Sequence, residues 1–456
     1  MSPHRYHVQD DSPMFFRVFS SAILALGLVN PTFALDEKEI AIRDAVTRGQ
    51  GEALALLEQA VNINSGTMNV DGVREVGQLF AEAFSDAGFS TRWVDGEVFS
   101  RGGHLVAEHG TKGPRVLLIG HLDTVFAKDS SFQKFARIDE DHAAGPGITD
   151  MKGGDVIILQ AAKALDAAGV LDELQLRVVL TGDEESRGRP LGVANAALIE
   201  AADWADIALG FEDGDGDPKT VVTARRSSSE WRLSVTGKPA HSSQIFRDDI
   251  GFGAALETAR ILDAWRVALS AIPNLTFNPG LVMAGTDLDH DDSNTRGTVF
   301  GKNNVIAQTA VVTGGMRAIS PEQIANAEAT MREIAAENLA QTTAEVTFNH
   351  GYPPMAPSAG NDTLLEYYSA ISEELGYGPV VAVDPRRAGA ADISFVADRV
   401  EAAIDGLGLM GDGGHTVDEV ADLRTLPQQT QRAAILLYRI AKGAVALQKS
   451  RTSSGS

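Results

Sequence analysis

The sequence contains no cysteine among its 456 residues. Disulfide bonds, thiolate metal ligands and cysteine nucleophiles are therefore excluded. A transition-metal site in this protein has to be built from histidine, aspartate and glutamate side chains.

Basic residues are also scarce, because 39 lysines and arginines stand against 62 aspartates and glutamates, giving a formal net charge of −23. A charge of this sign argues against nucleic acid or an anionic membrane as a partner. The hydrophobic (44%) and charged (22%) fractions are ordinary for a soluble globular protein. The length of the chain predicts two domains.

The apolar run near the N-terminus, VFSSAILALGLV at residues 18–29, is shorter than the roughly 20 residues that a membrane span needs. It follows Arg17 and precedes small residues at Thr32 and Ala34. This pattern predicts a signal peptide over residues 1–34, and therefore a periplasmic or secreted protein with no membrane contact after cleavage. A membrane anchor is the alternative. Residues 450–456 are expected to form a disordered tail.

Metal-binding residue types gather in the stretch that begins at Val116–Ile119, a short apolar run that ends at a glycine. His121 and Asp123 follow at once, and alternate residues of an extended segment point to the same side. Asp150 lies in a loop rich in glycine, before a predicted helix. An imidazole, a carboxylate that can orient it and a second carboxylate are the components of a metal site.

Two adjacent carboxylates, Glu184 and Glu185, follow a second predicted strand at Leu174–Leu180. A pair of glutamates in a turn is usually a surface feature. Here it follows a strongly apolar strand, where charges need a partner or solvent. One of the two can ligate a metal while its neighbour handles a proton.

Two further candidates are Glu212, which follows a short strand at Ile207–Phe211, and His415, which lies in a glycine loop after a predicted strand at Ile404–Leu409. The acidic run after Glu212 does not fit a calcium loop, because Pro218 stands where that loop needs glycine. A single histidine such as His415 carries little information by itself.

Strands and helices alternate over residues 35–224 and again over 351–449, which predicts an α/β sheet with helices on both faces. In such sheets, sites gather at the strand ends. Over residues 225–350 the pattern of predicted strands and helices changes, and segments rich in proline and glycine bound this part of the chain. We therefore expect a small inserted α+β domain. Its predicted elements are Glu230–Val235, Gly251–Leu269, Asn304–Thr313, Pro321–Gln341 and Ala344–Asn349.

Together these candidates supply two histidines and three carboxylates for metal binding. The set is His121, Asp150, Glu185, Glu212 and His415. If one carboxylate bridges two metals, each metal has three protein ligands, and a bound water completes each site. Such a pair lowers the pKa of the bound water and polarises a carbonyl group. Glu184 is then a candidate general base.

The motifs HLDTVF, GPGITDMKGG, TGDEES, GKPAHSS and GGHTVDE occur in this order, with a glutamate after a short strand between the third and fourth. In this combination the chain resembles the dinuclear zinc peptidase family of glutamate carboxypeptidase, aminoacylase and succinyl-diaminopimelate desuccinylase. The resemblance covers about residues 40–447. It implies a catalytic domain with a mixed sheet between helices, two zinc ions, and an inserted ferredoxin-like lid that often dimerises.

The resemblance also assigns roles to residues of the catalytic domain. His121 resembles a ligand of one zinc with Asp123 as its orienting carboxylate, and Asp150 resembles the bridging ligand. Glu184 matches the general base that activates the bridging water. Glu185, Glu212 and His415 match the remaining metal ligands.

In the inserted domain, His241 of GKPAHSS resembles a histidine that stabilises the oxyanion, often in the partner subunit's site. Asn304 and Arg317 resemble residues that hold the substrate at its carboxylate, for which the guanidinium fork is suited.

Substrate recognition departs from the family pattern at several positions. Ala307 replaces the usual proline after Asn-Val-Ile, and Gly315 replaces the acid two residues before the arginine. Tyr352 stands before Pro353 where glutamate-specific members have arginine. Residues 389–392 lack the hydroxyl residue usual in their motif. These departures argue against specificity for a C-terminal glutamate.

The leading hypothesis is an exported zinc-dependent hydrolase that cleaves a C–N amide bond of a small peptide or N-acyl amino acid, with cobalt or manganese as alternative metals. A dipeptidase or aminopeptidase of the same family is an alternative. A non-catalytic periplasmic binding protein on the same fold is an alternative of another class, disfavoured because every ligand and the base are present.

Overall fold

The computed structural model describes residues 34–291, 296–443 and 445. Residues 1–33 of the predicted signal peptide and the predicted tail at 450–456 lie outside the described residues. Within the described ranges, no helix combines the length and the apolar character that a membrane crossing requires.

A six-stranded mixed sheet carries the site. Its order is β1 (Ser90–Asp95), β2 (Gly103–His109), β6 (Gln175–Thr181), β3 (Arg115–His121), β7 (Ile207–Gly210) and β16 (Ala402–Ile404). The pairs from β6 to β16 are parallel, whereas β1 and β2 are antiparallel to their neighbours. Since β7 and β16 come from segments far apart in the sequence, two distant parts of the chain meet in one sheet.

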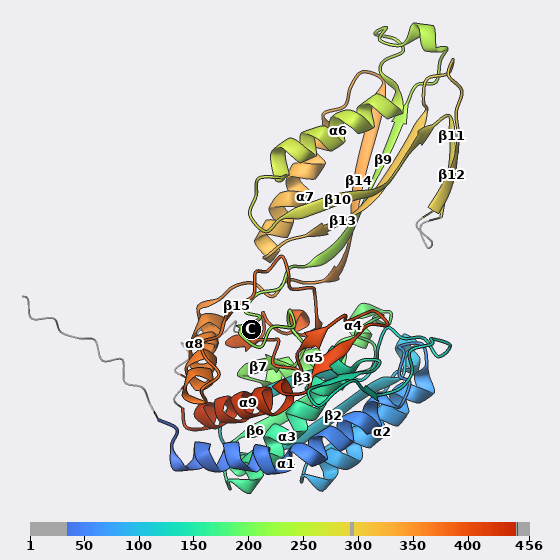
Figure 1. Cartoon of the computed structure of the whole chain (residues 1–456). Coiled ribbons are helices and arrows are strands. Elements are labelled where there is room, and N and C mark those ends of the chain that lie inside the picture. The colour runs from blue at the N-terminus through green and yellow to red at the C-terminus, as the bar shows by residue number, and fades with distance from the viewer. Residues whose placement is uncertain (1–33, 292–295, 444, 446–456) are drawn as a thin grey trace, which may run out of the picture. The chain divides into compact units, whose positions relative to one another are not determined.

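Helices cover both faces of this sheet (Figure 1). One face packs against α1 (Glu37–Val61), α2 (Val70–Asp86), α3 (Gly153–Ala167), α8 (Ala359–Glu374) and α9 (Thr425–Ala441). The other face packs against α5 (Ala196–Trp204) and the segment around Ile393. Alternate residues of β3 therefore enter different cores, Leu118 one and Leu117 the other. Burial on both faces explains why β3 carries the continuous apolar run Val116–Ile119.

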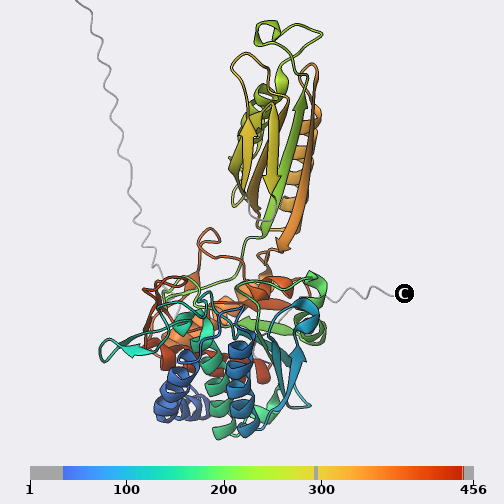
Figure 2. The same cartoon turned by 90° about the vertical axis from the view of Figure 1, so that its right-hand side faces the viewer.

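Residues 228–352, which we call the inserted module, form a second sheet with its own core. The strands β9 (Ser228–Gly237), β10 (Thr276–Gly285), β13 (Thr309–Arg317) and β14 (Thr342–Tyr352) pair antiparallel in the order β10-β13-β9-β14. Helices α6 (Gly253–Leu269) and α7 (Pro321–Ala336) complete the βαββαβ succession of a ferredoxin-like fold, whose strands are visible side by side in Figure 2.

The core of the inserted module is built on aromatic residues. Trp231 of β9 meets Trp265 of α6 edge to face, with ring centroids 5.2 Å apart. A short hairpin of β11 (Asp287–Asp291) and β12 (Arg296–Phe300) is added between β10 and β13 in sequence. The domain boundaries at 225 and 350 stay predictions.

Two predicted strands are wrong at their ends. The strand expected at Asn304–Thr313 begins only at Thr309, because Val305 and Ile306 pair instead with the loop around His241. The strand expected at Ile404–Leu409 ends at Ile404. The next residues leave the strand because the Asp405 side chain is drawn into hydrogen bonds and Gly406 has a φ of 81°.

Candidate metal centre

Three parallel strands end at the same edge of the main sheet and place polar residues there. His121 is the last residue of β3, the Glu184–Glu185 pair follows β6, and Glu212 follows β7. Because the carboxyl ends of parallel strands meet at one edge, residues far apart in sequence come together. Asp150 and His415 reach the same edge from loops.

Asp150 lies between the two histidines. Its Oδ1 is 3.0 Å from Nε2 of His121, and its Oδ2 is 2.9 Å from Nε2 of His415. The same nitrogen of His121 is 3.6 Å from Oε1 of Glu212, and that of His415 is 3.2 Å from Oε2 of Glu185. One carboxylate thus faces two imidazoles, each of which has a further carboxylate beside it.

These contacts define two groups of possible ligand atoms, each within 4.8 Å of one another. The first group is His121, Asp150 and Glu212, and the second is Asp150, Glu185 and His415. Asp150 belongs to both. The structure therefore brings together all five residues that the sequence suggests as metal ligands.

The carboxylates of the centre are buried close to one another. Burial raises the pKa of Glu212 well above its usual range, and the neighbouring Asp150 adds to the rise. Burial likewise raises the pKa of Glu184 to about 7. Negative charge is thus costly at this edge unless a cation accompanies it.

The imidazoles stand where that cation is needed. Burial alone would lower the pKa of His121, but Glu212 and Asp150 raise it well above its usual value. Hydrogen bonds to Asp150 and Glu185 raise the pKa of His415 to about 11. A divalent cation in each group would balance the same carboxylates and leave the imidazoles neutral, as metal ligands must be. The donor set therefore fits metal binding.

Asp123 connects the first histidine to the glutamate pair. Nδ1 of His121 is 2.9 Å from the backbone oxygen of Asp123 and 3.6 Å from its carboxylate. The fully buried carboxylate accepts hydrogen bonds from the hydroxyl of Thr67 at 2.6 Å and from the backbone N–H groups of Glu184 and Glu185 at 3.0 and 3.2 Å. Asp123 thus orients both the imidazole and the turn that carries the glutamates.

Glu419 is a supporting residue that sequence reasoning missed. Its buried carboxylate accepts hydrogen bonds from the backbone N–H groups of Gly147, Thr149 and Asp150, at 2.9, 2.9 and 3.3 Å. It thereby fixes the loop that presents Asp150. The one available signal was its place in GGHTVDE, four residues after His415.

Asp405 was also missed, and it supports Glu212. Its Oδ1 accepts a hydrogen bond from the backbone N–H of Glu212 at 3.2 Å, and its Oδ2 accepts one from Nε of Arg225 at 2.9 Å. The carboxylate lies so close to Gly210 that a Cβ there would be 2.3 Å from Oδ1. Only glycine fits at the end of β7.

The three candidates in the inserted module are exposed, and their hydrogen bonds lie within the module. His241 contacts Ser243, with Nδ1 2.8 Å from the hydroxyl. The backbone oxygen of Asn304 accepts from the N–H of Ser242 at 2.9 Å, so His241 and Asn304 occupy adjoining segments. Arg317 lies elsewhere, on β13 opposite Thr276 of β10.

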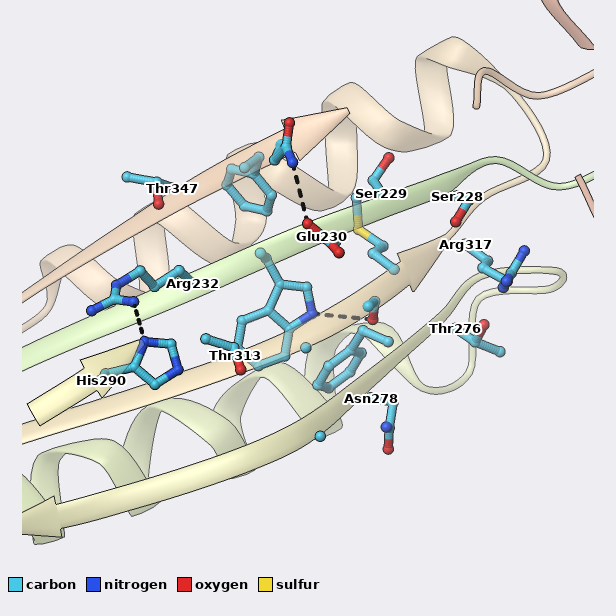
Figure 3. Close-up of a pocket in the computed structure, with 18 residues that line it drawn as sticks. Ser228, Ser229, Glu230, Arg232, Thr276, Asn278, His290, Thr313, Arg317 and Thr347 are labelled. Atoms are coloured by element: carbon cyan, nitrogen blue, oxygen red, sulfur yellow. Dashed lines mark hydrogen bonds between the residues drawn. The ribbon is translucent and has the colours of Figure 1, made fainter. Parts of the chain in front are cut away.

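Arg317 lines a cavity of about 640 Å³ over the sheet of the inserted module. Figure 3 shows Arg317 and Thr276 near one end of this cavity, and the hydrogen-bonded pair of Arg232 and His290 near the other. Gly315 of β13 adds no side chain to the cavity. A Cβ at this position would contact only the backbone oxygen of Ser229, at 3.8 Å. The departure at Gly315 therefore leaves space beside Arg317.

A mixed sheet with two overlapping groups of possible metal-ligand atoms at its edge is the framework of a metal-dependent enzyme. The model of Peptidase family M20/M25/M40 matches residues 117–439, and the chain belongs to this family. The protein is therefore a metallopeptidase-type hydrolase that acts on peptide or amide C–N bonds.

Relatives of established name cover most of the chain. Carboxypeptidase G2 of Pseudomonas sp. (strain RS-16) is 26% identical over 435 residues, which are 94% of this chain and 99% of the relative. Succinyl-diaminopimelate desuccinylase of Xanthomonas campestris pv. campestris (strain 8004) is 29% identical over 378 residues, 76% of this chain and 90% of the relative. The aminopeptidase PepT structure from Bacillus cereus ATCC 10987 shares the fold, with a TM-score of 0.68, 19% identity, and coverage of 86% of this chain and 99% of that one.

Replacing Glu419 by glutamine places an amide donor against backbone N–H groups that need an acceptor. We expect Glu419→Gln to loosen the Asp150 loop and to weaken metal binding by about 10- to 100-fold, measured by competition with a chelator. The neighbouring exposed carboxylate provides the control, because Asp418→Asn should leave the affinity unchanged. Equal affinity in the Glu419 variant and the wild type would contradict the supporting role.

Proposed function

We propose that the centre holds two divalent ions, one in each ligand group, with Asp150 bridging them. The observation that carries this proposal is that the two oxygens of Asp150 face two different imidazoles. Zinc suits a set of histidines and carboxylates, and cobalt or manganese are alternatives. Bound ions would polarise the substrate carbonyl and lower the pKa of a water molecule.

Glu184 is the general base of this proposal. It neighbours Glu185 in sequence but belongs to neither ligand group, so its carboxylate is free for proton transfer. It takes a proton from the attacking water and delivers it to the nitrogen of the leaving amine, as the C–N bond breaks. Asp123 supports this role by holding the Glu184 N–H.

The proposed substrate is a small peptide or an N-acyl amino acid with a free carboxylate. Arg317 supports it, because an exposed guanidinium beside a cavity suits a bidentate carboxylate contact. Asn304 and His241 are the other proposed substrate contacts, the latter for the oxyanion. The names of carboxypeptidase G2 and the desuccinylase agree with this class. The fold likeness to an aminopeptidase keeps the aminopeptidase or dipeptidase alternative open.

Export and dimerisation complete the proposal. The signal peptide predicted over residues 1–34 motivates a periplasmic or secreted location. The exposure of His241 motivates a homodimer through the inserted module, in which this histidine serves the partner's site.

Replacing Glu184 by glutamine removes the proton acceptor and leaves the ligand groups intact. We expect Glu184→Gln to lower kcat by at least about 100-fold while the protein keeps its full metal content. Hydrolysis of dipeptides and N-acyl amino acids, together with elemental analysis of the same sample, measures both quantities. Wild-type turnover in this variant would refute the assignment of the base.

Removing the Arg317 guanidinium should affect only substrates that carry a free carboxylate. For these we expect Arg317→Ala to lower kcat/KM by about 10- to 100-fold, with a much smaller effect on amidated analogues. Arg266→Ala is the matched control, because Arg266 is an exposed arginine of the same module that pairs with Asp263 at 2.8 Å. Equal losses of kcat/KM on free and amidated substrates would contradict the proposal that Arg317 binds the substrate carboxylate.

Native mass spectrometry of the protein recovered from the periplasm or medium tests export and assembly together. We expect a subunit that begins near Leu35 and a complex of two subunits. An unprocessed subunit, or a monomer at micromolar concentration, would contradict the corresponding part of the proposal.

A further inference from the structure

Tyr352 is the last residue of β14 in the inserted module, yet its hydroxyl is bonded to the active-site edge of the main sheet. The hydroxyl donates a hydrogen bond to the backbone oxygen of Glu184 at 2.7 Å. Its ring packs against Phe395, with the ring centroids 4.7 Å apart. The final residue of the module's last strand is thus hydrogen-bonded to Glu184, the proposed general base.

Arg187 determines which way this hydroxyl points. Its Nη2 donates to the oxygen of Tyr352 at 3.3 Å. A tyrosine hydroxyl has one proton, and an arginine can only donate. Because the oxygen accepts from Arg187, its proton is directed to the carbonyl of Glu184.

Arg187 itself has little freedom to move. Its side chain is 4% exposed and contacts Asp183 at 2.5 Å and also Asp392. Asp392 in turn accepts a hydrogen bond from the hydroxyl of Thr181, at the end of β6. The support behind Tyr352 is therefore anchored on the same strand that leads to Glu184.

The peptide groups on both sides of Glu184 are consequently held. Its N–H donates to Asp123 at 3.0 Å, and its C=O accepts from Tyr352 at 2.7 Å. A backbone fixed at both its N–H and its C=O gives the side chain a defined direction. Since catalysis depends on placing the base to within fractions of an ångström, loss of one support should lower the rate.

We propose that Tyr352 is a positioning residue for Glu184, which makes the placement of the general base depend on where the last strand of the inserted module ends. This inference rests on the proposed role of Glu184. It also accounts for the departure at Tyr352: the phenol is committed to the protein and does not bind substrate.

The variant Tyr352→Phe removes the hydroxyl and keeps the ring on Phe395. We expect kcat to fall about tenfold, with KM and metal content unchanged. Replacing Tyr352 by 4-aminophenylalanine keeps an N–H donor at this position and should restore most of the rate. This second variant separates the lost hydrogen bond from any general loss of folding.

Tyr368→Phe is the matched control. Tyr368 is fully buried, and its hydroxyl donates to Oε1 of Gln429 at 3.1 Å, away from the metal ligands in sequence. Like Tyr352→Phe, this variant removes one hydrogen-bonding tyrosine hydroxyl. It should therefore lower the stability of the protein by an amount comparable to Tyr352→Phe, but it should leave kcat unchanged.

A double-mutant cycle with Glu184→Gln separates this inference from the proposed function. If Tyr352 acts through the base, Tyr352→Phe should cause no further loss of rate when Glu184 is already glutamine. Full activity of Glu184→Gln would refute the base itself. An inactive Glu184→Gln beside a Tyr352→Phe that keeps wild-type kcat would refute only the positioning role. A raised KM with unchanged kcat, or the loss of metal, would also overturn it.

Discussion

The shared contact of Asp150 with two histidines is the constraint on which the rest of the site depends. A carboxylate that faces both imidazoles has to be held in one orientation, and the loop that carries it has little regular structure of its own. Glu419 supplies that orientation by accepting the backbone N–H groups around Asp150. On the side of β3, Asp123 does the same for the imidazole and the glutamate pair. The carboxylates proposed as metal ligands are thus supported by Glu419 and Asp123, which belong to neither ligand group.

The residues at strand ends could be predicted from the sequence because two local signals coincide there. An apolar run predicts a buried strand, and a polar residue directly after it lies at the sheet edge where the other strand ends also meet. His121, Glu185 and Glu212 were found in this way. The α/β sheet followed from the alternation of strands and helices, its mixed character from the family resemblance, and the inserted α+β module from the change in pattern between segments rich in proline and glycine.

The supporting residues could not be predicted, because their partners are remote in sequence. Glu419 and Gly147 are 272 positions apart, and Asp405 and Arg225 are 180 apart. A single acid in a loop gives no local sign of such a partner. The same reason explains the misplaced strand at Asn304–Thr313, where pairing with the loop around His241 replaced the expected extension of the sheet. Likewise, the sequence indicates only that Tyr352 replaces an arginine of the family, because the partner of its hydroxyl, the backbone oxygen of Glu184, lies 168 positions away.

The stoichiometry of bound metal in Asp150→Ala and Glu212→Ala tests the central claim most directly. If Asp150 is shared by two ions, the wild type binds two metals per chain by elemental analysis after dialysis. Asp150→Ala then loses both ions, whereas Glu212→Ala loses only one, because Glu212 belongs to a single ligand group. One metal per chain in the wild type, or an Asp150→Ala variant that keeps one ion at wild-type affinity, would contradict the account.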